Sequence, residues 1–357
     1  MKWGILLISM NNTNIKQIIK QKEYNFLRTN NLIKDNILFL TIGGSHAYGT
    51  NNENSDIDIR GCILDPLSNI IQSFNFETVT NTETDTTIYT VFKLIKLLTN
   101  ANPNIIELLG NSYERYYIPN EHSKITNMLL DNKNIFLSKN VINAFSGYAG
   151  SQLRRLQCAL ARDKYTQAQK ENHIIKSCNN VLDTLQFRTS KKYVRDDFEL
   201  YIDKSDKEYL DEEIFCNINL KKYPLRDTKN ILNELTNVIK SYDKNMINGR
   251  NKKKDDNHLN KHAMHLVRLY LMCFDILEKR EINTYREHDR NFLLDIRNGK
   301  YQKQDGTYYQ EFFELIDEYD KRIKYDSKHT ELPDKPNNKV IDELKFEITK
   351  YIIEREQ

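Results

Sequence analysis

The stretch 37–61, ILFLTIGGSHAYGTNNENSDIDIRG, constrains the fold of this chain more than any other. It opens with the apolar run 37–40, short and bounded by turn residues, which predicts a buried strand. The glycines that follow allow a tight turn, and a short helix can begin there with Ser45 as its cap. After a polar loop, the pattern predicts a return to extended structure at 55–60.

The returning segment alternates acidic and apolar residues. Successive side chains of a strand point to opposite faces, so Asp56, Asp58 and Arg60 share one face. Two carboxylates this close repel each other unless a cation lies between them, and hard oxygen ligands suit Mg²⁺ or Mn²⁺. Backbone N–H groups at a glycine–serine helix start suit a phosphate. The stretch therefore predicts a site that holds a nucleoside triphosphate (NTP) by its phosphates; an Asp-x-Asp in a surface turn is the alternative.

A strand, a Gly-Ser turn, a short helix and Asp-x-Asp about ten residues later resemble the signature of the DNA polymerase β-like nucleotidyltransferase superfamily. More narrowly, GGSHAYGT…SDIDIRG resembles GSxAYG…SDxDxRG, the pattern of a bacterial and phage nucleotidyltransferase family, some of whose relatives are associated with RNA ligases. The resemblance implies an α+β fold. Residues 1–130 would form a catalytic domain with a small mixed sheet and helices, and residues 131–357 a mostly α-helical domain that binds substrate and nucleotide.

The family completes its metal site with a third carboxylate on a neighbouring strand. Here 74–89 is rich in Thr, Val, Phe and Ile, which predicts one or two strands. The resemblance favours Asp85 as the third acid, with Glu83 second; a solvated acid at the sheet edge is the alternative. It implies that Asp56, Asp58 and Asp85 are catalytic and hold two Mg²⁺ or Mn²⁺ ions.

The second informative stretch is 261–276, KHAMHLVRLYLMCFDI, whose nearly continuous apolar surface predicts a buried helix. Lys261, His265 and Arg268 recur at i, i+4 and i+7 along one narrow stripe. Because buried cations need anionic partners, the stripe faces either the triphosphate or carboxylates of neighbouring helices. A similar K-x-x-x-H-x-x-R-L element in the family favours the triphosphate.

Further segments resemble family elements. In NPNIIELL, at 102–109, Asn104 is expected to cap a helix, and Glu107 either holds a basic neighbour or faces solvent. GYAGSQLRR, at 147–155, resembles GYA-x-x-Q-x-x-R/K, and Arg297 is expected to add a basic group to the site. The resemblance also implies nucleotide contacts from Gly44, Ser45, Tyr48 and Arg60.

The implied reaction is attack by an acceptor hydroxyl on the α-phosphate of an NTP, with ATP the favoured donor, and release of pyrophosphate. The implied acceptor is RNA, either a tRNA end or a broken strand under repair. Transfer of NMP to a protein or small molecule is the enzymatic alternative, and a nucleotide sensor or antitoxin-like protein the non-catalytic one. Retention of all three candidate acids argues against a degenerate site.

Composition sets limits on these readings. A chain of 357 residues predicts two domains. No segment reaches the roughly 20 apolar residues of a membrane span and no signal peptide is evident, so a cytoplasmic protein with no membrane partner is expected. Five scattered cysteines without CxxC spacing indicate neither disulfides nor zinc. The net charge of +3 leaves RNA binding open, and the charged region 191–256, with lysines at 252–254, predicts a solvated loop.

Overall fold

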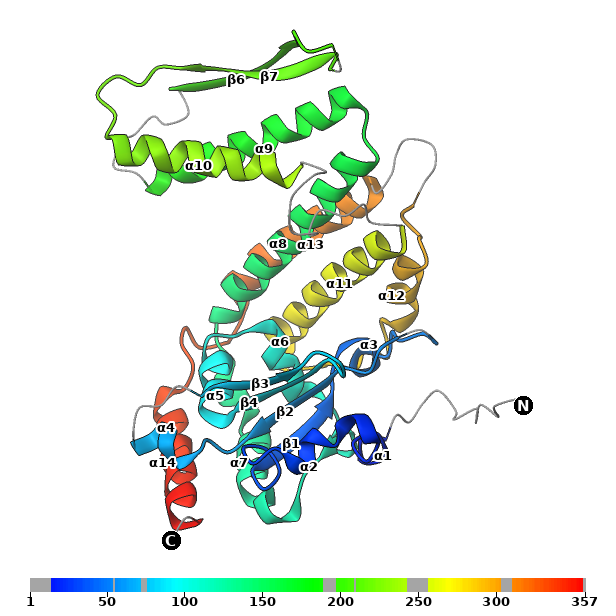
Figure 1. Cartoon of the computed structure of the whole chain (residues 1–357), viewed down its shortest axis with the longest axis vertical. Coiled ribbons are helices and arrows are strands. Elements are labelled where there is room, and N and C mark those ends of the chain that lie inside the picture. Colours follow the sequence, from blue (N-terminus) through cyan, green and yellow to red (C-terminus); the bar gives the residue numbers. More distant parts are fainter. Residues whose placement is uncertain are drawn as a thin grey trace, which may run out of the picture. The chain divides into compact units, whose positions relative to one another are not determined.

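In the computed structural model, a five-stranded mixed sheet organises the N-terminal part of the chain (Figure 1). Its order is β3-β4-β2-β1-β5; β2 and β4 are parallel, and the other neighbours are antiparallel. The strands are β1 (Ile37–Ile42), β2 (Ile59–Ile63), β3 (Thr78–Asn81), β4 (Thr86–Thr90) and β5 (Tyr116–Tyr117). The predicted small mixed sheet is confirmed, and all six residues of β1 are buried.

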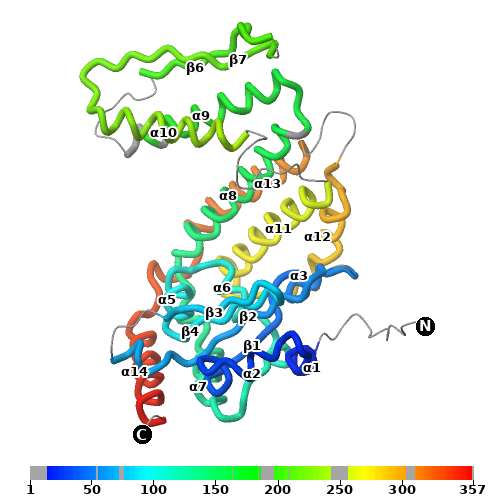
Figure 2. The backbone as a smooth tube through the Cα atoms, in the orientation of Figure 1, coloured from blue at the N-terminus to red at the C-terminus, as the bar shows by residue number. Residues whose placement is uncertain are grey.

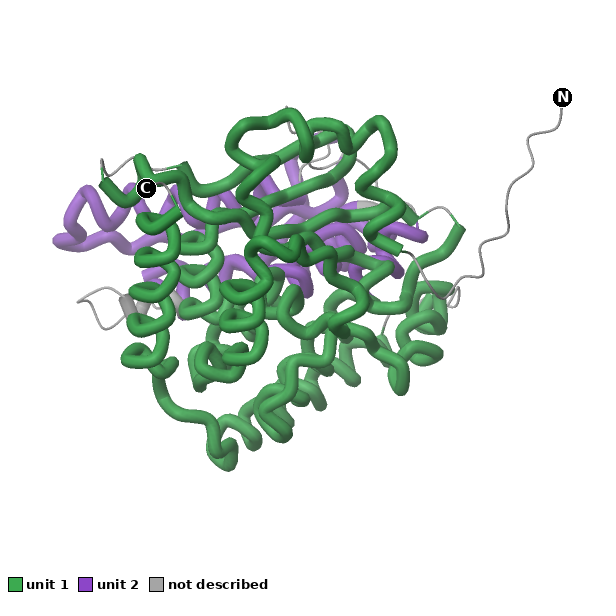
Figure 3. The backbone as a smooth tube through the Cα atoms, turned by 90° about the horizontal axis from the view of Figure 1, so that it is seen from below, with its two compact units in different colours: residues 1–150, 264–357 green, residues 151–263 purple. Residues whose placement is uncertain are grey.

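The structure describes residues 14–53, 55–71, 76–188, 197–208, 210–242, 256–302 and 310–355. It divides into two compact units (Figure 3): unit 1 comprises residues 1–150 and 264–357, and unit 2 comprises residues 151–263. This division differs from the predicted boundary at residue 130, because the C-terminal segment packs on helices of the N-terminal part and belongs to the same unit. The lysines at 252–254 lie outside the described residues.

Short helices surround the sheet of unit 1. The segment before β1 forms three short helices, α1, η1 and α2. Helices α1 and α7 contact β1, whereas α5 contacts β2 and β4. These elements are α1 (Ile15–Ile18), η1 (Lys22–Tyr24), α2 (Phe26–Thr29), α3 (Gly44–Tyr48), α4 (Leu67–Ile71), α5 (Val91–Thr99), α6 (Pro103–Ile106), η2 (Glu107–Gly110), η3 (Tyr113–Arg115), η4 (Asn120–His122), α7 (Ser123–Asp131) and η5 (Lys133–Phe136).

The C-terminal segment completes unit 1. Helix α14 contacts α4, α7 and η5, so the red end of the chain lies beside its blue and cyan parts (Figure 2). Asn102, not Asn104, caps α6: its side chain accepts a hydrogen bond of 3.1 Å from the backbone N–H of Asn104. The remaining elements are α11 (Asp256–Phe274), the π-helix η6 (Asp275–Lys279), α12 (Arg290–Arg297), α13 (Gln310–His329) and α14 (Asn338–Arg355).

Unit 2 contains a β-hairpin that the sequence did not predict. The antiparallel strands β6 (Phe198–Lys204) and β7 (Glu212–Ile218) contact α9 (Gln167–Arg188), which also packs on α10 (Leu225–Ser241). The end of α8 (Asn140–Asp163) and the start of α11 belong to the same unit. Buried Leu182, Phe198 and Ile231 form one of its apolar clusters.

All five cysteines are free thiols, as the sequence predicts. Among the described residues, no helix combines the length and apolar character that a membrane crossing needs.

Candidate active site

Asp58 and Asp85 meet because they precede two parallel strands in register. Ile59 is the first residue of β2 and lies opposite Thr86, the first residue of β4. The residue before each strand is an aspartate, so two carboxylates stand side by side at one end of the sheet. Their side chains are hydrogen-bonded to each other. The register thus brings together two of the three acids that the sequence predicts.

A glycine turn holds Asp58 against the start of α3. The backbone N–H of Gly43 donates to the carbonyl of Asp58 at 2.8 Å. Gly44 has φ +60°, and a Cβ at this residue would lie 1.7 Å from Asp58 Oδ2. A side chain cannot occupy that space, so glycine is required for this close approach. Ser45 is half-buried inside α3 and does not cap it, because the cap position belongs to Gly43.

Arg60 forms ion pairs with both carboxylates. Its Nη2 lies 3.2 Å from Asp85 Oδ1 and 3.5 Å from Asp58 Oδ1, and its Nη1 donates to the backbone carbonyl of Asp85. The hydrogen bond from Asp58 and then the charge of Arg60 hold the pKa of Asp85 below its usual value, although partial burial opposes them. The side chain of Asp85 is 61% exposed, so this cluster faces solvent.

Asp56 and Glu83 lie near this cluster in sequence and are exposed. Asp56 follows a loop that is closed by mutual hydrogen bonds between Asn52 and Ser55. Glu83 lies in the turn between β3 and β4, with its N–H bonded to the side chain of Asn81. Asp85 contacts both Asp58 and Arg60, whereas no such contact is recorded for Glu83; which of the two is the third acid stays a prediction. Among the described residues, no three His, Cys, Asp or Glu side chains are gathered closely enough to hold a metal ion.

Three arginines fix the C-terminal end of α3 and the loop beyond it. Arg115 donates to the carbonyl of His46 at 3.1 Å, and Arg290 donates to the carbonyl of Gly49 at 2.7 Å. Arg297 donates to the carbonyl of Thr50 and reaches the hydroxyl of Ser55 at 3.4 Å. Cations are favourable at a helix C-terminus because its last carbonyls lack helical partners. Burial lowers the pKa of Arg297.

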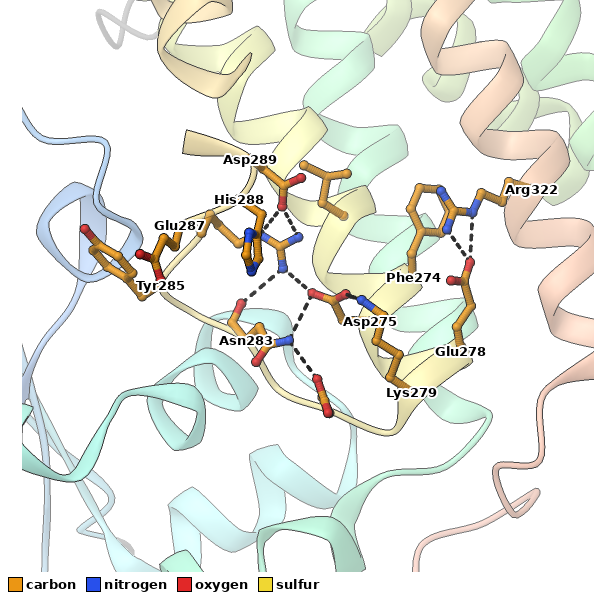
Figure 4. Close-up of a pocket in the computed structure, with 13 residues that line it drawn as sticks. Phe274, Asp275, Glu278, Lys279, Asn283, Tyr285, Glu287, His288, Asp289 and Arg322 are labelled. Atoms are coloured by element: carbon orange, nitrogen blue, oxygen red, sulfur yellow. Dashed lines mark hydrogen bonds and ion pairs between the residues drawn. The ribbon is translucent and has the colours of Figure 1, made fainter. Parts of the chain in front are cut away.

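A second network positions Tyr285 against the same helix end. Gly49 has φ +75°, and a Cβ there would lie 2.6 Å from the Tyr285 ring. The loop that carries Tyr285 borders a cavity of about 540 Å³ (Figure 4). In that cavity Arg286 is paired with Asp275 and Asp289, and Asn283 also bonds to Asp275. Since these charges are paired with one another, we infer that the residues lining the cavity hold the loop of Tyr285 in place.

Below α3, Tyr48, Glu107 and Arg268 form a buried network. The Tyr48 hydroxyl donates to Glu107 Oε1 at 2.7 Å, and Arg268 Nη1 lies 3.0 Å from Glu107 Oε2. The Arg268 guanidinium also stacks on the Tyr48 ring, 3.6 Å from its centroid. Arg268 is fully buried, and burial raises the pKa of Tyr48 far above its usual value.

In the structure Tyr48 and Arg268 are engaged in this internal network, and their nucleotide contacts stay a prediction. Both side chains are buried, and Glu107 already supplies the anion that Arg268 requires. The internal salt bridge, which the sequence left as the alternative, is the arrangement found, and Glu107 holds a basic neighbour as one interpretation proposed. A structural role for these residues follows.

The other two members of the predicted stripe differ from Arg268. His265 is half-buried; its Nδ1 lies 3.3 Å from Arg268 Nη2, and its ring meets Tyr148 edge to face. Lys261 is exposed and belongs to unit 2. Nucleotide contact by His265 or Lys261 stays a prediction.

Arg115 and Arg290 are the residues that sequence reasoning missed. The carbonyls they hold are 69 and 241 positions away along the chain, and neither arginine belongs to a periodic pattern or to a motif. Arg297, in contrast, was expected to be near the site because its segment resembles a family element. Only the fold could reveal the other two.

Comparison with known proteins agrees with this geometry. Residues 9–184 match the model of RlaP, the RNA repair pathway DNA polymerase beta family. The match includes the strands β1 to β5, all three candidate acids and most of α9, and it ends before α11. Searches of curated proteins and of solved structures returned no match. With its Gly-Ser turn, Asp-x-Asp and mixed sheet in place, the region 9–184 is similar to a polymerase-β-like nucleotidyltransferase family.

Proposed function

We propose that this protein is a metal-dependent nucleotidyltransferase that transfers NMP from an NTP, ATP in the first instance, to a hydroxyl group of RNA. The observation that carries the proposal is the meeting of Asp58 and Asp85 before two parallel strands, directly against the glycine turn. The family match to an RNA repair pathway supports RNA as the acceptor.

The donor set fits a hard divalent cation. Asp58 and Asp85 offer carboxylate oxygens at a solvent-accessible edge, with Asp56 two residues away, and such oxygens are the preferred ligands of Mg²⁺ and Mn²⁺. Arg60 now supplies the positive charge that two adjacent carboxylates need. We propose Asp56, Asp58 and Asp85 as the metal ligands; Asp58 and Asp85 already adjoin, and Asp56 would have to move toward them when an ion binds. A divalent ion held there would neutralise negative charge on the phosphates during transfer.

The remaining groups act on the reactants. The backbone N–H groups of Gly44 and Ser45 would donate to phosphate oxygens, since Gly44 lies directly against Asp58. Arg60, which is paired with Asp58 and Asp85, would also contact a phosphate, because a guanidinium binds phosphate in a two-pronged geometry. Asp85, kept ionised by its lowered pKa, accepts the proton of the acceptor hydroxyl. The acceptor oxygen bonds to the α-phosphorus and pyrophosphate leaves.

Transfer of α-labelled ATP to RNA tests this proposal. Incubation of the purified protein with Mg²⁺, labelled ATP and total RNA is expected to label RNA, and chelation of the metal is expected to abolish the label. Asp58→Asn and Asp56→Asn should each lower the rate about 100-fold or more, the scale of losing one essential electrostatic group. Asp342→Asn, in the exposed Lys345–Asp342 pair of α14, is the matched control and should keep the full rate.

The same assay separates the alternatives. Label on protein instead of RNA would identify a protein-modifying enzyme, and normal transfer by Asp58→Asn would remove the assigned site. Thermal melting of each variant shows whether the fold is intact. Because Asp58 and Asp85 lie at an accessible edge, we expect the melting temperature to change by no more than a few degrees.

A further inference from the structure

Unit 2 contains a basic pocket that the sequence analysis did not identify. It has a volume of about 760 Å³ and is formed by α8, α9, α10 and α11 within that unit. Among the described residues that line it, Arg154, Arg155 and Arg162 are basic and Glu234 is acidic. The described lining therefore has more basic than acidic side chains, in a chain whose overall charge is close to neutral.

The arginines come from one side of a single helix. Positions 154, 155 and 162 fall within about 100° of arc on α8, and the first and last are separated by roughly 12 Å along the helix axis. Arg154 and Arg155 are exposed at the surface, whereas Arg162 is 6% exposed. A cation in a concave, partly desolvated position attracts an anion more strongly than one on an open surface. Guanidinium groups also match the geometry of phosphate oxygens.

The remainder of the lining suits a nucleotide better than a bare phosphate. Ala159, Val181 and Val238 provide an apolar surface, and Asn237 and Ser241 provide polar groups on α10. Pockets for small organic ligands have volumes of about 300–1,000 Å³ and combine such an apolar surface with a few polar groups. Here, a base or sugar can lie on the apolar side while its phosphates face α8.

We infer that this pocket binds a nucleotide of the RNA acceptor strand, with neighbouring phosphates of the strand along the arginines of α8. The inference rests on the proposed function, because it takes RNA as the acceptor. An extended row of cations favours a strand over a free triphosphate, because a strand presents successive phosphates along the roughly 12 Å of helix that the arginines span. Exposed Arg154 and Arg155 let the strand continue out of the pocket.

Binding of a fluorescent single-stranded RNA 12-mer to the full-length protein, without NTP, is the first test. Arg154→Gln/Arg155→Gln is expected to weaken binding at least 10-fold. It should also reduce the slope of log Kd against log salt by about 1.4, since each phosphate contact on a single strand contributes about 0.7. Arg226→Gln/Lys229→Gln, exposed on α10 and outside the pocket, removes the same charge. This control should change Kd less than 2-fold; equal weakening by both pairs would overturn the inference.

Two cysteines provide a footprint that does not depend on mutation. Cys158 lines the pocket and is half-buried, whereas Cys216 is exposed on β7, outside it. Bound 12-mer is expected to slow alkylation of Cys158 at least 5-fold and to leave Cys216 unchanged. RNA that binds without protecting Cys158, or Mg-ATP that protects it as well as RNA does, would overturn the inference.

These readouts are separate from catalysis. Calorimetric titration of Arg154→Gln/Arg155→Gln with Mg-ATP should give the wild-type affinity. If RNA protects Cys158 while wild-type protein transfers no label, the pocket assignment stands and the proposed reaction fails. If label reaches RNA normally in that double variant, the reaction stands and the pocket assignment fails.

Discussion

Two clusters in unit 1 combine arginine with carboxylate, and they differ in exposure. In the first, Arg60 lies between Asp58 and Asp85 at an open sheet edge. In the second, Arg268 and Glu107 are buried beneath α3, and Tyr48 occupies the second carboxylate oxygen. The first cluster has two acids and one arginine and faces solvent. The second has one acid and one arginine and is buried.

The comparison teaches how the same residue types divide between chemistry and structure. An exposed ion pair contributes little to stability, typically 0–1 kcal/mol, so its charges can be exchanged for those of a metal or a phosphate. Breaking a buried pair destabilises the fold strongly, because removal of one partner leaves a buried charge without a counter-charge. The family resemblance placed Asp58 and Arg268 in one site. In the structure they belong to different clusters, because Arg268 is fully buried against Glu107 and Asp58 is paired with Arg60.

The largest expected effect comes from breaking the sealed cluster. Glu107→Gln leaves Arg268 fully buried without its anion, so the free energy of unfolding should fall by about 3–5 kcal/mol. Urea denaturation followed by circular dichroism measures it. Asp58→Asn is the matched variant in the open cluster and should change the free energy of unfolding by less than about 1 kcal/mol. A similar loss in both variants would erase the distinction between the clusters.

A glycine substitution sharpens the comparison at the open cluster. Gly44→Ala places a Cβ against Asp58 Oδ2 at φ +60°; we expect a loss of about 1–2 kcal/mol from the backbone conformation alone and a displaced Asp58 with reduced transfer activity. Gly147→Ala is the control, because a Cβ there meets no atom within 4 Å inside α8. It should stabilise the protein by about 0.5–1 kcal/mol. If Gly44→Ala retained both stability and activity, the close approach of Asp58 would be unimportant.

The smallest expected effect concerns pH. Asp58 and Arg60 hold the pKa of Asp85 below its usual value in the folded protein. A lowered folded-state pKa gives stability that is present above the unfolded value of about 3.9 and is lost as the pH falls through the folded value. The stability difference between wild type and Asp85→Asn should therefore shrink between pH 5 and pH 2.5. Because Asp85 is mostly exposed, the change should stay below about 1 kcal/mol. A growing difference would contradict the shift.

Local pattern predicted much of the fold around the open cluster. The apolar run of β1 and the glycine turn specify their own conformations, so that part of the site was visible in the sequence, whereas the predicted extended segment 55–60 forms a strand only from Ile59. Asp85 was suggested by resemblance, and the parallel register of β2 and β4 supplies its physical reason. The division into units and the positions of Arg115 and Arg290 depend on contacts between distant segments, which no local pattern encodes.

The surroundings of the α11 stripe could not be predicted for a related reason. Helical spacing shows that Lys261, His265 and Arg268 share a side of the helix, but it does not show what that side meets. Glu107, on a short helical turn far away in sequence, was the missing partner of Arg268. The burial of the side chains also differs along the stripe, since Lys261 is exposed and Arg268 is buried.

The order of segments in the chain has a consequence for biosynthesis. Glu107 precedes Arg268 by 161 residues, and the whole of unit 2 lies between them. At translation rates of about 5–20 residues per second, the carboxylate leaves the ribosome roughly 8–32 seconds before its counter-charge exists. During that interval Glu107 must remain hydrated. The N-terminal part of unit 1 therefore cannot form this buried ion pair until the C-terminal helices have been synthesised.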